Sequence, residues 1–415
     1  MKLYKKLFVL GAVLAGGLVF QGETVHADTR SYGPDWSVYQ GAHGKYGTAK
    51  DDFVISQIGG TYGGQYIDQS TYAPQVASAI AAGKRVHTYI WDQVGSSIAL
   101  QKAAMDRFLP RVQTPKGSIV ALDYEAGASA SVSGNTDAIL YGMNRIKAAG
   151  YKPMYYSYKP YTLAHVDYNR ILRAYPNSLW IAAYKNYLPA VTPDFGYFPS
   201  LPGIAIWQFT STYGTGSLDG NVDLLGATQA GYHKSTTSST GKVTVKPKTQ
   251  TAATKAGQTA NATPKSAIKA GTVVKVNFSA KRWATGQAIP SFIKGKTYTV
   301  KQVAGNRVLL ANVLSWANKS DVEILNTTRT VSIHTSATTS DYVQYKTFYP
   351  TTTVNVRTGM STAYRITGTL SRGDHIYYNH IYIRGGYVWA RYQSYYGPRY
   401  VALGVMGGQS YGNRY

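Results

Sequence analysis

Two carboxylic acids one residue apart form the pattern in this chain that most directly suggests chemistry. Asp123 and Glu125 flank Tyr124 and follow the apolar run 118–122. Alternate side chains of a strand share a face, so both carboxyls would point the same way, about 7 Å apart. Two carboxyls at about that separation can act on one glycosidic bond, and each negative charge makes its neighbour harder to ionise. The spacing therefore makes this pair a candidate for acid catalysis on a sugar.

The distribution of glutamate supports this interpretation. Glu125 is the only Glu between Glu23 and Glu323, because the other acidic residues of that region are Asp. An Asp-x-Glu pattern is nevertheless common, and on its own it more often marks an ordinary acidic strand end exposed to solvent. Other segments of the chain have to decide between the two interpretations.

The elements that must position the pair lie within residues 30–230, where short apolar strands alternate with helix-like stretches. The expected strands are 53–55, 85–91, 118–122, 152–157, 179–184 and 203–209. Stretches 74–83 and 136–150 are rich in Ala and Ile and end at glycine, as helices often do. This alternation predicts an α/β fold with a parallel (β/α) barrel, whose catalytic groups stand at the carboxyl ends of its strands.

Four segments, taken in order, resemble the family 25 glycoside hydrolases, the Chalaropsis-type lysozymes. They are residues 35–41 (DWSVYQG), 121–125 (ALDYE), 179–184 (LWIAAY), and 206–211 (IWQFTS) leading to 220–223 (GNVD). The likeness covers about residues 31–228. It implies a barrel with a reduced helix count. It also implies an N-acetylmuramidase that hydrolyses the β-1,4 bond between N-acetylmuramic acid and N-acetylglucosamine in peptidoglycan.

The same resemblance implies roles for individual residues. Glu125 would be the general acid and then the base for water. Asp123 would stabilise the developing positive charge, either as a nucleophile or by orienting the acetamido group of the substrate. Asp35 and Asp223 would line the same cleft. The sugar-contacting wall would be formed by Tyr89, Tyr156, Tyr184, Trp207 and Gln208. For the aromatic residues of this set, core packing is the alternative.

No cofactor or metal is expected. The histidines of the barrel region lack the spacing of metal ligands, and the chain contains no Cys. A glycine-rich phosphate loop before a helix and a Gly-x-Ser-x-Gly elbow are also missing from the sequence.

The two ends of the chain indicate export and attachment to a cell wall. Residues 1–27 have a basic start, an apolar run and a small-x-small site, which is typical of a secretory signal peptide, and no later run is long enough to span a membrane. Of the net charge of +24, residues 233–415 carry +20. Outside a cell such a charge favours anionic wall polymers over nucleic acid. The expected location is secreted and wall-associated, as in Gram-positive bacteria.

The second half of the chain is expected to be modular. After the barrel (28–232) come a flexible Ser/Thr/Lys-rich linker (233–268), a small β domain (269–326), a spacer (327–345), a second small β domain (346–405) and a loose tail (406–415). Both β domains resemble bacterial Src-homology-3-like wall-binding modules. For the second module this resemblance implies wall contacts by Trp389, Arg391 and Tyr395.

Two other functions compete with the muramidase. A non-catalytic wall-binding or adhesion protein on a decayed barrel would have no need of a lone Glu beside Asp123. Another sugar hydrolase, such as a chitinase-like barrel, would share the paired acids and lack the wall-binding modules.

Overall fold

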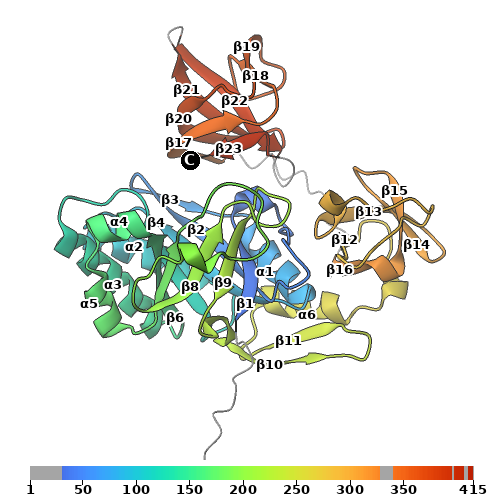
Figure 1. The fold of residues 1–415 in the computed structure, drawn as a ribbon, viewed down its shortest axis with the longest axis horizontal. Helices are drawn as coiled ribbons and strands as arrows, with labels where there is room; N and C mark the ends of the chain where they lie inside the picture. Colours follow the sequence, from blue (N-terminus) through green and yellow to red (C-terminus); the bar gives the residue numbers. More distant parts are fainter. Residues whose placement is uncertain (1–29, 328–339, 395–396, 406–409, 415) are drawn as a thin grey trace, which may run out of the picture.

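The structure, a computed structural model, describes residues 30–327, 340–394, 397–405 and 410–414. An α/β barrel is followed by a five-stranded sheet at its side and a seven-stranded sheet at the top of the view in Figure 1. The predicted fold class, a barrel with few helices followed by two small all-β domains, is confirmed. Within the described ranges no helix is long and apolar enough to cross a membrane. The predicted signal peptide, residues 1–27, lies outside them.

Eight strands close into the barrel, because β1 at one end of the strand order also pairs with β2 near the other end. In ring order they are β1 (Ser31–Trp36), β9 (Asp219–Asp223), β8 (Ile204–Thr210), β7 (Leu179–Ala182), β6 (Lys152–Tyr158), β5 (Ile119–Asp123), β4 (Arg85–Asp92) and β2 (Phe53–Tyr62). The short strand β3 (Gln65–Asp68) pairs with β2 as a hairpin.

One strand departs from the predicted parallel arrangement. β9 runs antiparallel to both of its neighbours, β8 and β1, whereas the other strands of the ring pair in parallel. The reason is the connection between β8 and β9, which is residues 211–218. That length is too short for a crossover, since a parallel return needs about a dozen residues or more. As a result β9 begins at the end of the barrel where its neighbours finish.

Strand alternation divides the barrel residues between two buried apolar layers. Ile55, Ala121 and Met154 belong to the cluster inside the barrel, and Val54 and Leu122 belong to the larger cluster that packs under the helices. Side chains of a strand alternate between its two faces, so each strand contributes to both layers.

The helices that cover the barrel are unevenly distributed around it. α1 (Tyr72–Ala81) precedes β4, α2 (Ile98–Phe108) precedes β5, α3 (Val132–Ala148) precedes β6, and α4 (Lys159–His165) and α5 (Tyr168–Ala174) precede β7. Between β7 and β8 the chain forms only a 3-10 turn, η3 (Phe195–Tyr197). The predicted helices 74–83 and 136–150 correspond to α1 and α3.

The segment expected to be a flexible linker, 233–268, is folded instead. It contains β10 (Tyr232–Thr237), β11 (Val243–Pro247) and α6 (Ala252–Ala262), and α6 packs against α1. The approach is close, because a Cβ on Gly257 would lie 2.4 Å from the Ala77 carbonyl oxygen. Asn261 donates to the Ala81 carbonyl oxygen at 2.9 Å. Small apolar residues and a glycine, which resemble a linker by composition, here allow two helices to pack.

The five-stranded sheet follows at once and shares a core with the barrel. Its strands are β12 (Val273–Val276), β13 (Thr297–Ala304), β14 (Arg307–Leu310), β15 (Ser315–Asn318) and β16 (Val322–Asn326). Val274 and Tyr46 belong to one buried cluster. The Lys275 ammonium lies 4.5 Å from the Tyr46 ring centroid and 2.7 Å from a Glu323 carboxylate oxygen. This sheet is therefore attached to the barrel through a shared apolar core and a buried Lys275 side chain.

The seven-stranded sheet, called the C-terminal domain below, comprises residues 340–414. Its strands are β17 (Ser340–Pro350), β18 (Val354–Arg357), β19 (Ile366–Leu370), β20 (Ile376–Arg384), β21 (Tyr387–Ser394), β22 (Gly397–Val405) and β23 (Gly412–Arg414). The expected spacer reached to residue 345, but β17 already starts at Ser340. The expected loose tail ends in β23, which pairs with β17 through Phe348 and Arg414. Backbone pairing with an edge strand thus orders these last described residues.

Candidate active site

The two acids of the Asp-x-Glu pattern stand at the carboxyl end of β5. Asp123 is the last residue of that strand, and Glu125 follows two positions later. The Tyr124 side chain between them is fully buried in the outer layer, where its hydroxyl donates to the Gly95 carbonyl oxygen at 3.0 Å. By alternation, Asp123 and Glu125 are on the opposite side, which is the interior of the barrel end. Asp123 is 6% exposed, and its Oδ1 is buried without a hydrogen-bond partner among the described residues.

Asp35 on β1 is held at the same end by a network of amides and hydroxyls. The side-chain nitrogens of Gln208 and Asn221 each donate to Asp35 Oδ2 at 2.8 Å. The Tyr156 hydroxyl donates to Gln208 Oε1 at 2.8 Å, and the Tyr184 hydroxyl donates to the same atom. These contacts lock the Gln208 amide with its nitrogen toward Asp35. The network therefore fixes the orientation of the carboxyl.

A fourth acid, Asp219, completes the group and was missed by the sequence analysis. It is the first residue of β9 and pairs with Asp35 in the antiparallel register. The available signal was the short connection 211–218, which forces an antiparallel return and so carries the start of β9 to the catalytic end. Asn221, two residues later on the same face of β9, was quoted as part of a motif but given no role.

The four acids influence one another's ionisation. Burial is the main cause that raises the pKa of Asp35 to about 6, and the negative charge of Glu125 adds to it, whereas the hydrogen bonds from Asn221 and Gln208 oppose it. Burial also raises the pKa of Glu125. For Asp123 and Asp219 burial, followed by neighbouring carboxylates, raises the pKa well above its ordinary value. Such perturbed carboxyls gathered at a barrel end are typical of a catalytic site.

Four of the five predicted sugar-contacting residues belong to the interior of the barrel, and Trp207 does not. Tyr156, Tyr184 and Gln208 lie at the barrel end beside the acids, where they support Asp35. Tyr89 is 8% exposed and packs edge-on against Trp180, with ring centroids 6.2 Å apart. Burial raises the pKa of Tyr89, and the charges of Asp35 and Asp123 add to this effect.

Trp207 does not face this site. It belongs to the outer apolar layer, packs edge-on against Phe195 and Phe198, and donates from Nε1 to the Ala183 carbonyl oxygen at 2.9 Å. Since successive side chains of β8 point to opposite faces, Trp207 and Gln208 cannot both face the barrel interior. The prediction of a sugar contact for Trp207 is replaced by a core-packing role.

Asp223 is also separated from the other acids. It is the last residue of the antiparallel strand β9 and pairs with Ser31 at the start of β1, so it lies at the opposite end of the barrel. Its carboxylate accepts hydrogen bonds from the backbone N–H groups of Leu225, Ala227 and Thr228 and from the Thr228 hydroxyl, at 2.7–3.2 Å. The structure therefore assigns Asp223 to a turn that closes the bottom of the barrel.

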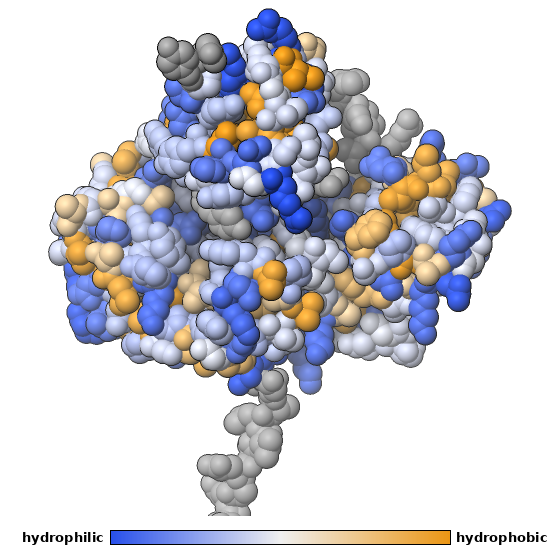
Figure 2. Space-filling view, turned by 45° about the horizontal axis from the view of Figure 1, so that its top comes forward, coloured by the Kyte–Doolittle hydropathy of each residue, from blue (hydrophilic) through white to orange (hydrophobic). Residues whose placement is uncertain are grey.

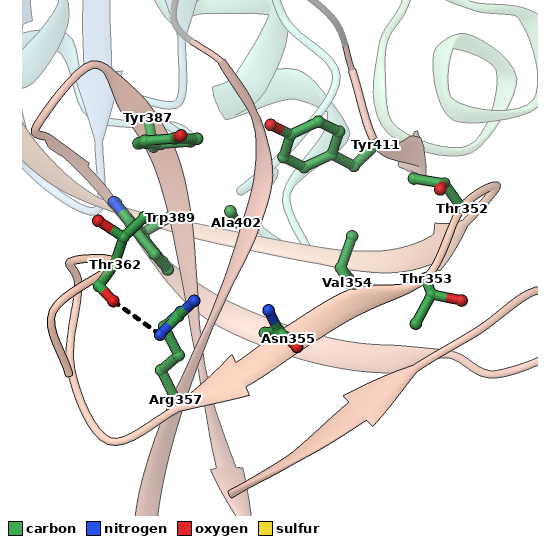
Figure 3. A pocket seen from close by; sticks show the side chains of 10 residues that line it. All are labelled: Thr352, Thr353, Val354, Asn355, Arg357, Thr362, Tyr387, Trp389, Ala402 and Tyr411. Atoms are coloured by element: carbon green, nitrogen blue, oxygen red, sulfur yellow. Dashed lines mark hydrogen bonds between the residues drawn. The ribbon is translucent and has the colours of Figure 1, made fainter. Parts of the chain in front are cut away.

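The C-terminal domain contains a pocket of about 330 Å³, shown in Figure 3. Its lining includes Tyr387, Trp389 and Tyr411 on one side and Asn355 and Arg357 on the other. Trp389 is 1% exposed, and its Nε1 donates to the Arg384 carbonyl oxygen at 3.1 Å.

Of the other two residues predicted to bind the wall, Arg391 is not part of the described lining of this pocket. Arg391 is half-buried on β21, opposite Tyr400 of β22. Tyr395 lies outside the described residues.

Two family models match the chain. The model of glycosyl hydrolases family 25 matches residues 34–218, and that of the bacterial SH3 domain matches residues 328–403. A solved structure of the Cpl-1 endolysin complexed with a peptidoglycan analogue is 19% identical, covers 89% of this chain and 94% of that chain, and has a TM-score of 0.41.

Curated phage proteins are similar over part of their length. The D-alanyl-L-alanine endopeptidase of Streptococcus phage B30 is 44% identical over 137 residues, which are 33% of this chain and 31% of that protein. The chain spans less than half the length of this and three further Streptococcus phage relatives. The lysozyme of Lactococcus phage mv1 is 32% identical over 183 residues, which are 42% of this chain and 89% of that protein. Because this match covers most of a lysozyme and the family model extends from β1 to the start of β9, the chain belongs to glycosyl hydrolases family 25.

Proposed function

We propose that this protein is a peptidoglycan hydrolase that cleaves the β-1,4 bond between N-acetylmuramic acid and N-acetylglucosamine. One observation carries the proposal: Asp123, Glu125, Asp35 and Asp219 gather at the end of the barrel where the parallel strands finish. Membership of family 25 supports the same reaction. A scaffold that only bound a wall would gain nothing from three or more carboxyls that repel one another, because each buried charge costs free energy.

Glu125 is the proposed general acid. Burial raises its pKa, so a larger fraction of the group keeps a proton at a given pH, and the proton can pass to the glycosidic oxygen as the bond breaks. The resulting carboxylate can then take a proton from the attacking water.

Asp123 is the proposed partner that stabilises the positive charge at the anomeric carbon. Its Oδ1, which is buried without a partner among the described residues, leaves one oxygen for the substrate. This oxygen can attack the anomeric carbon or orient the acetamido group of the sugar. In their ionised forms Asp35 and Asp219 would add negative charge beside the same carbon, and Gln208 and Asn221 hold Asp35 in place.

The rest of the chain is proposed to deliver this site to the wall. We assign residues 28–232 to the catalytic domain, 269–326 and the C-terminal domain (340–414) to small β domains, and 1–27 to a signal peptide for secretion. The pocket lined by Tyr387 and Arg357 is a candidate contact with the wall. The net charge of +20 over residues 233–415 favours anionic wall polymers as additional partners.

Substitution of the two glutamates of the described chain tests the proposal. Glu125→Gln keeps the shape and removes the proton donor, so release of reducing ends from purified peptidoglycan should fall by at least about a hundredfold. Glu323→Gln is the matched control, since Glu323 pairs with Lys275 away from the barrel end. Mass analysis of the products should show N-acetylmuramic acid at the new reducing ends. Equal rates for Glu125→Gln and the unaltered chain, or wall binding without any hydrolysis by the unaltered chain, would refute the proposal.

A further inference from the structure

The C-terminal domain is docked on the catalytic end of the barrel, and the contact includes specific polar interactions. The Tyr39 hydroxyl, in the turn after β1, donates to Gln344 Oε1 of β17 at 3.3 Å. The guanidinium of Arg414 on β23 lies 3.5 Å from the centroid of the Tyr39 ring. In Figure 1 β17 and β23 are the strands of this domain nearest to the barrel, and in Figure 2 the domain is seated above it.

Apolar side chains continue this contact to the strand ends beside the acids. A single cluster contains Tyr62 of β2, with Tyr39, Ile67 and Trp91 packed against it, and Phe348 and Ile376 of the C-terminal domain. Tyr62 is 5% exposed, and its ring stacks on that of Trp91 with centroids 5.7 Å apart. Trp91 pairs directly with Asp123 in the register of β4 and β5. The docked domain therefore reaches the strand next to the catalytic pair.

Opposite charges face each other across the contact. The positive charge of Lys346, on β17, lowers the otherwise raised pKa of Asp123, Glu125 and Asp219. Arg414 acts on Asp219 in the same direction. Two cations of the C-terminal domain thus act on the acids of the barrel across the contact that Tyr39 makes with Gln344 and Arg414, as an electrostatic latch. Such a latch weakens with salt, because it is partly open to solvent.

The docked arrangement conflicts with a polymeric substrate. Asp123 and Asp35 are each 6% exposed and Glu125 is half-buried, so only a small part of the catalytic group is open to a glycan strand in this arrangement. A sugar must approach within about 3 Å of a catalytic carboxyl before bond cleavage. The C-terminal domain stands on β2 and on the turn at Tyr39, so a long glycan strand that approaches the catalytic end also meets this domain.

We propose that the C-terminal domain is an autoinhibitory lid, which Lys346 and Arg414 hold closed over the acids and which wall binding releases. This inference rests on the proposed muramidase activity. The pocket of the domain provides a route for release, because Tyr411 lines it and immediately precedes β23, which ends in Arg414. A wall component that enters the pocket displaces Tyr411 and with it the strand that carries Arg414. Anionic wall polymers also compete for the two cations.

A charge reversal in the full chain tests the lid. Lys346→Glu with Arg414→Glu replaces attraction by repulsion from the acids, so hydrolysis of a short soluble N-acetylmuramic acid–N-acetylglucosamine oligomer should rise about tenfold or more. Arg365→Glu with Arg372→Glu is the matched control, because both side chains are exposed on the same domain and should leave the rate unchanged. Equal rates for the latch variant and the unaltered chain would overturn the lid.

A chemical cross-link holds the C-terminal domain on the barrel. Formation of the cross-link reports docking independently of any activity measurement. The chain has no Cys, so Tyr39→Cys with Gln344→Cys introduces one pair that a short bismaleimide can bridge. Bridged protein should lose hydrolysis of the oligomer, whereas protein treated with a monofunctional maleimide should keep it. No bridging, or full activity after bridging, would overturn the inference. If the chain can be bridged but neither the unbridged chain nor the latch variant cleaves any glycan, the proposed muramidase function is refuted. The inhibitory role is then refuted as well, whereas docking of the C-terminal domain is still supported.

Discussion

Asp35 and Asp219 lie opposite each other on neighbouring antiparallel strands, and this pairing brings two acids distant in sequence to one end of the barrel. Asp223, on the same strand as Asp219, lies at the other end opposite Ser31. β9 therefore carries Asp219 at the catalytic end and Asp223 in a structural turn at the other end. The two acids can be told apart by experiment.

Asp219→Asn should lower kcat on peptidoglycan by roughly a hundredfold, because it removes a carboxyl whose ionised form stabilises the positive transition state. Its midpoint of urea unfolding should stay near that of the unaltered chain. Asp223→Asn should instead lower stability and spare kcat, since it weakens hydrogen bonds that a fully buried carboxylate accepts at a turn. We expect a loss of about 2–3 kcal/mol in the free energy of unfolding, with kcat of the folded fraction retained. The reverse pattern would restore Asp223 to the active site.

Asn221→Leu should raise the pKa of Asp35 further above about 6, because the hydrogen bond from Asn221 is the largest influence that lowers it. Carbon-13 NMR of the aspartate carboxyls would measure the titration directly. Asn144→Leu is the control, since Asn144 accepts from Tyr175 on the exposed helix surface. An unchanged titration of Asp35 in Asn221→Leu would mean that the network does not tune this carboxyl.

Asp92→Asn should flatten the dependence of stability on pH. Asp92 is fully buried on β4, and burial raises its pKa from 3.8 to about 8 against the hydrogen bond from Gln101. The native state therefore binds the proton more tightly than the unfolded chain. Its stability decreases as the pH rises from about 4 to about 8, by at most about 1.4 kcal/mol per pH unit for this group. Urea titrations at several pH values would measure the slope. The exposed Asp137→Asn should keep the slope of the unaltered chain.

Gly257→Val should destabilise the protein by about 1–3 kcal/mol, because the added side chain has no room between α6 and α1. Ala256→Val is the neighbouring control, since Ala256 is exposed on the same helix. Chemical unfolding followed by circular dichroism distinguishes the two variants. Equal stability of both would show that residues 233–268 act as the flexible linker that their composition suggests.

Tyr387→Ala should weaken binding to purified walls by about tenfold, because the Tyr387 ring forms one side of the pocket in the C-terminal domain. Tyr377→Ala is the matched control, as Tyr377 is 63% exposed on β20 and does not line that pocket. Co-sedimentation with walls at fixed salt measures both. A larger loss for Tyr377→Ala would move the wall contact to another face of the domain.

Local pattern was sufficient for a large part of this protein. The spacing of Asp123 and Glu125 at the end of an apolar strand, and the alternation of strands with helices, predicted a barrel and its acidic pair. These features depend on the two-residue period of a strand and on the polarity of neighbouring residues, which are properties of short segments. Four motifs in a characteristic order also indicated the family of glycoside hydrolases.

Relationships between distant segments were decided only by the tertiary structure. Barrel closure through an antiparallel strand selected Asp219 over Asp223, and the inward turn of Gln208 assigned Trp207 to the outer layer. Packing against α1 orders α6, although the composition of that segment is typical of a linker. Docking of the C-terminal domain allows the charge of Lys346 to act on the acids. The sequence by itself determined which groups exist and which way each strand can face. Which groups meet depends on chain closure and on buried surface shared between elements far apart in sequence, because no local period encodes either.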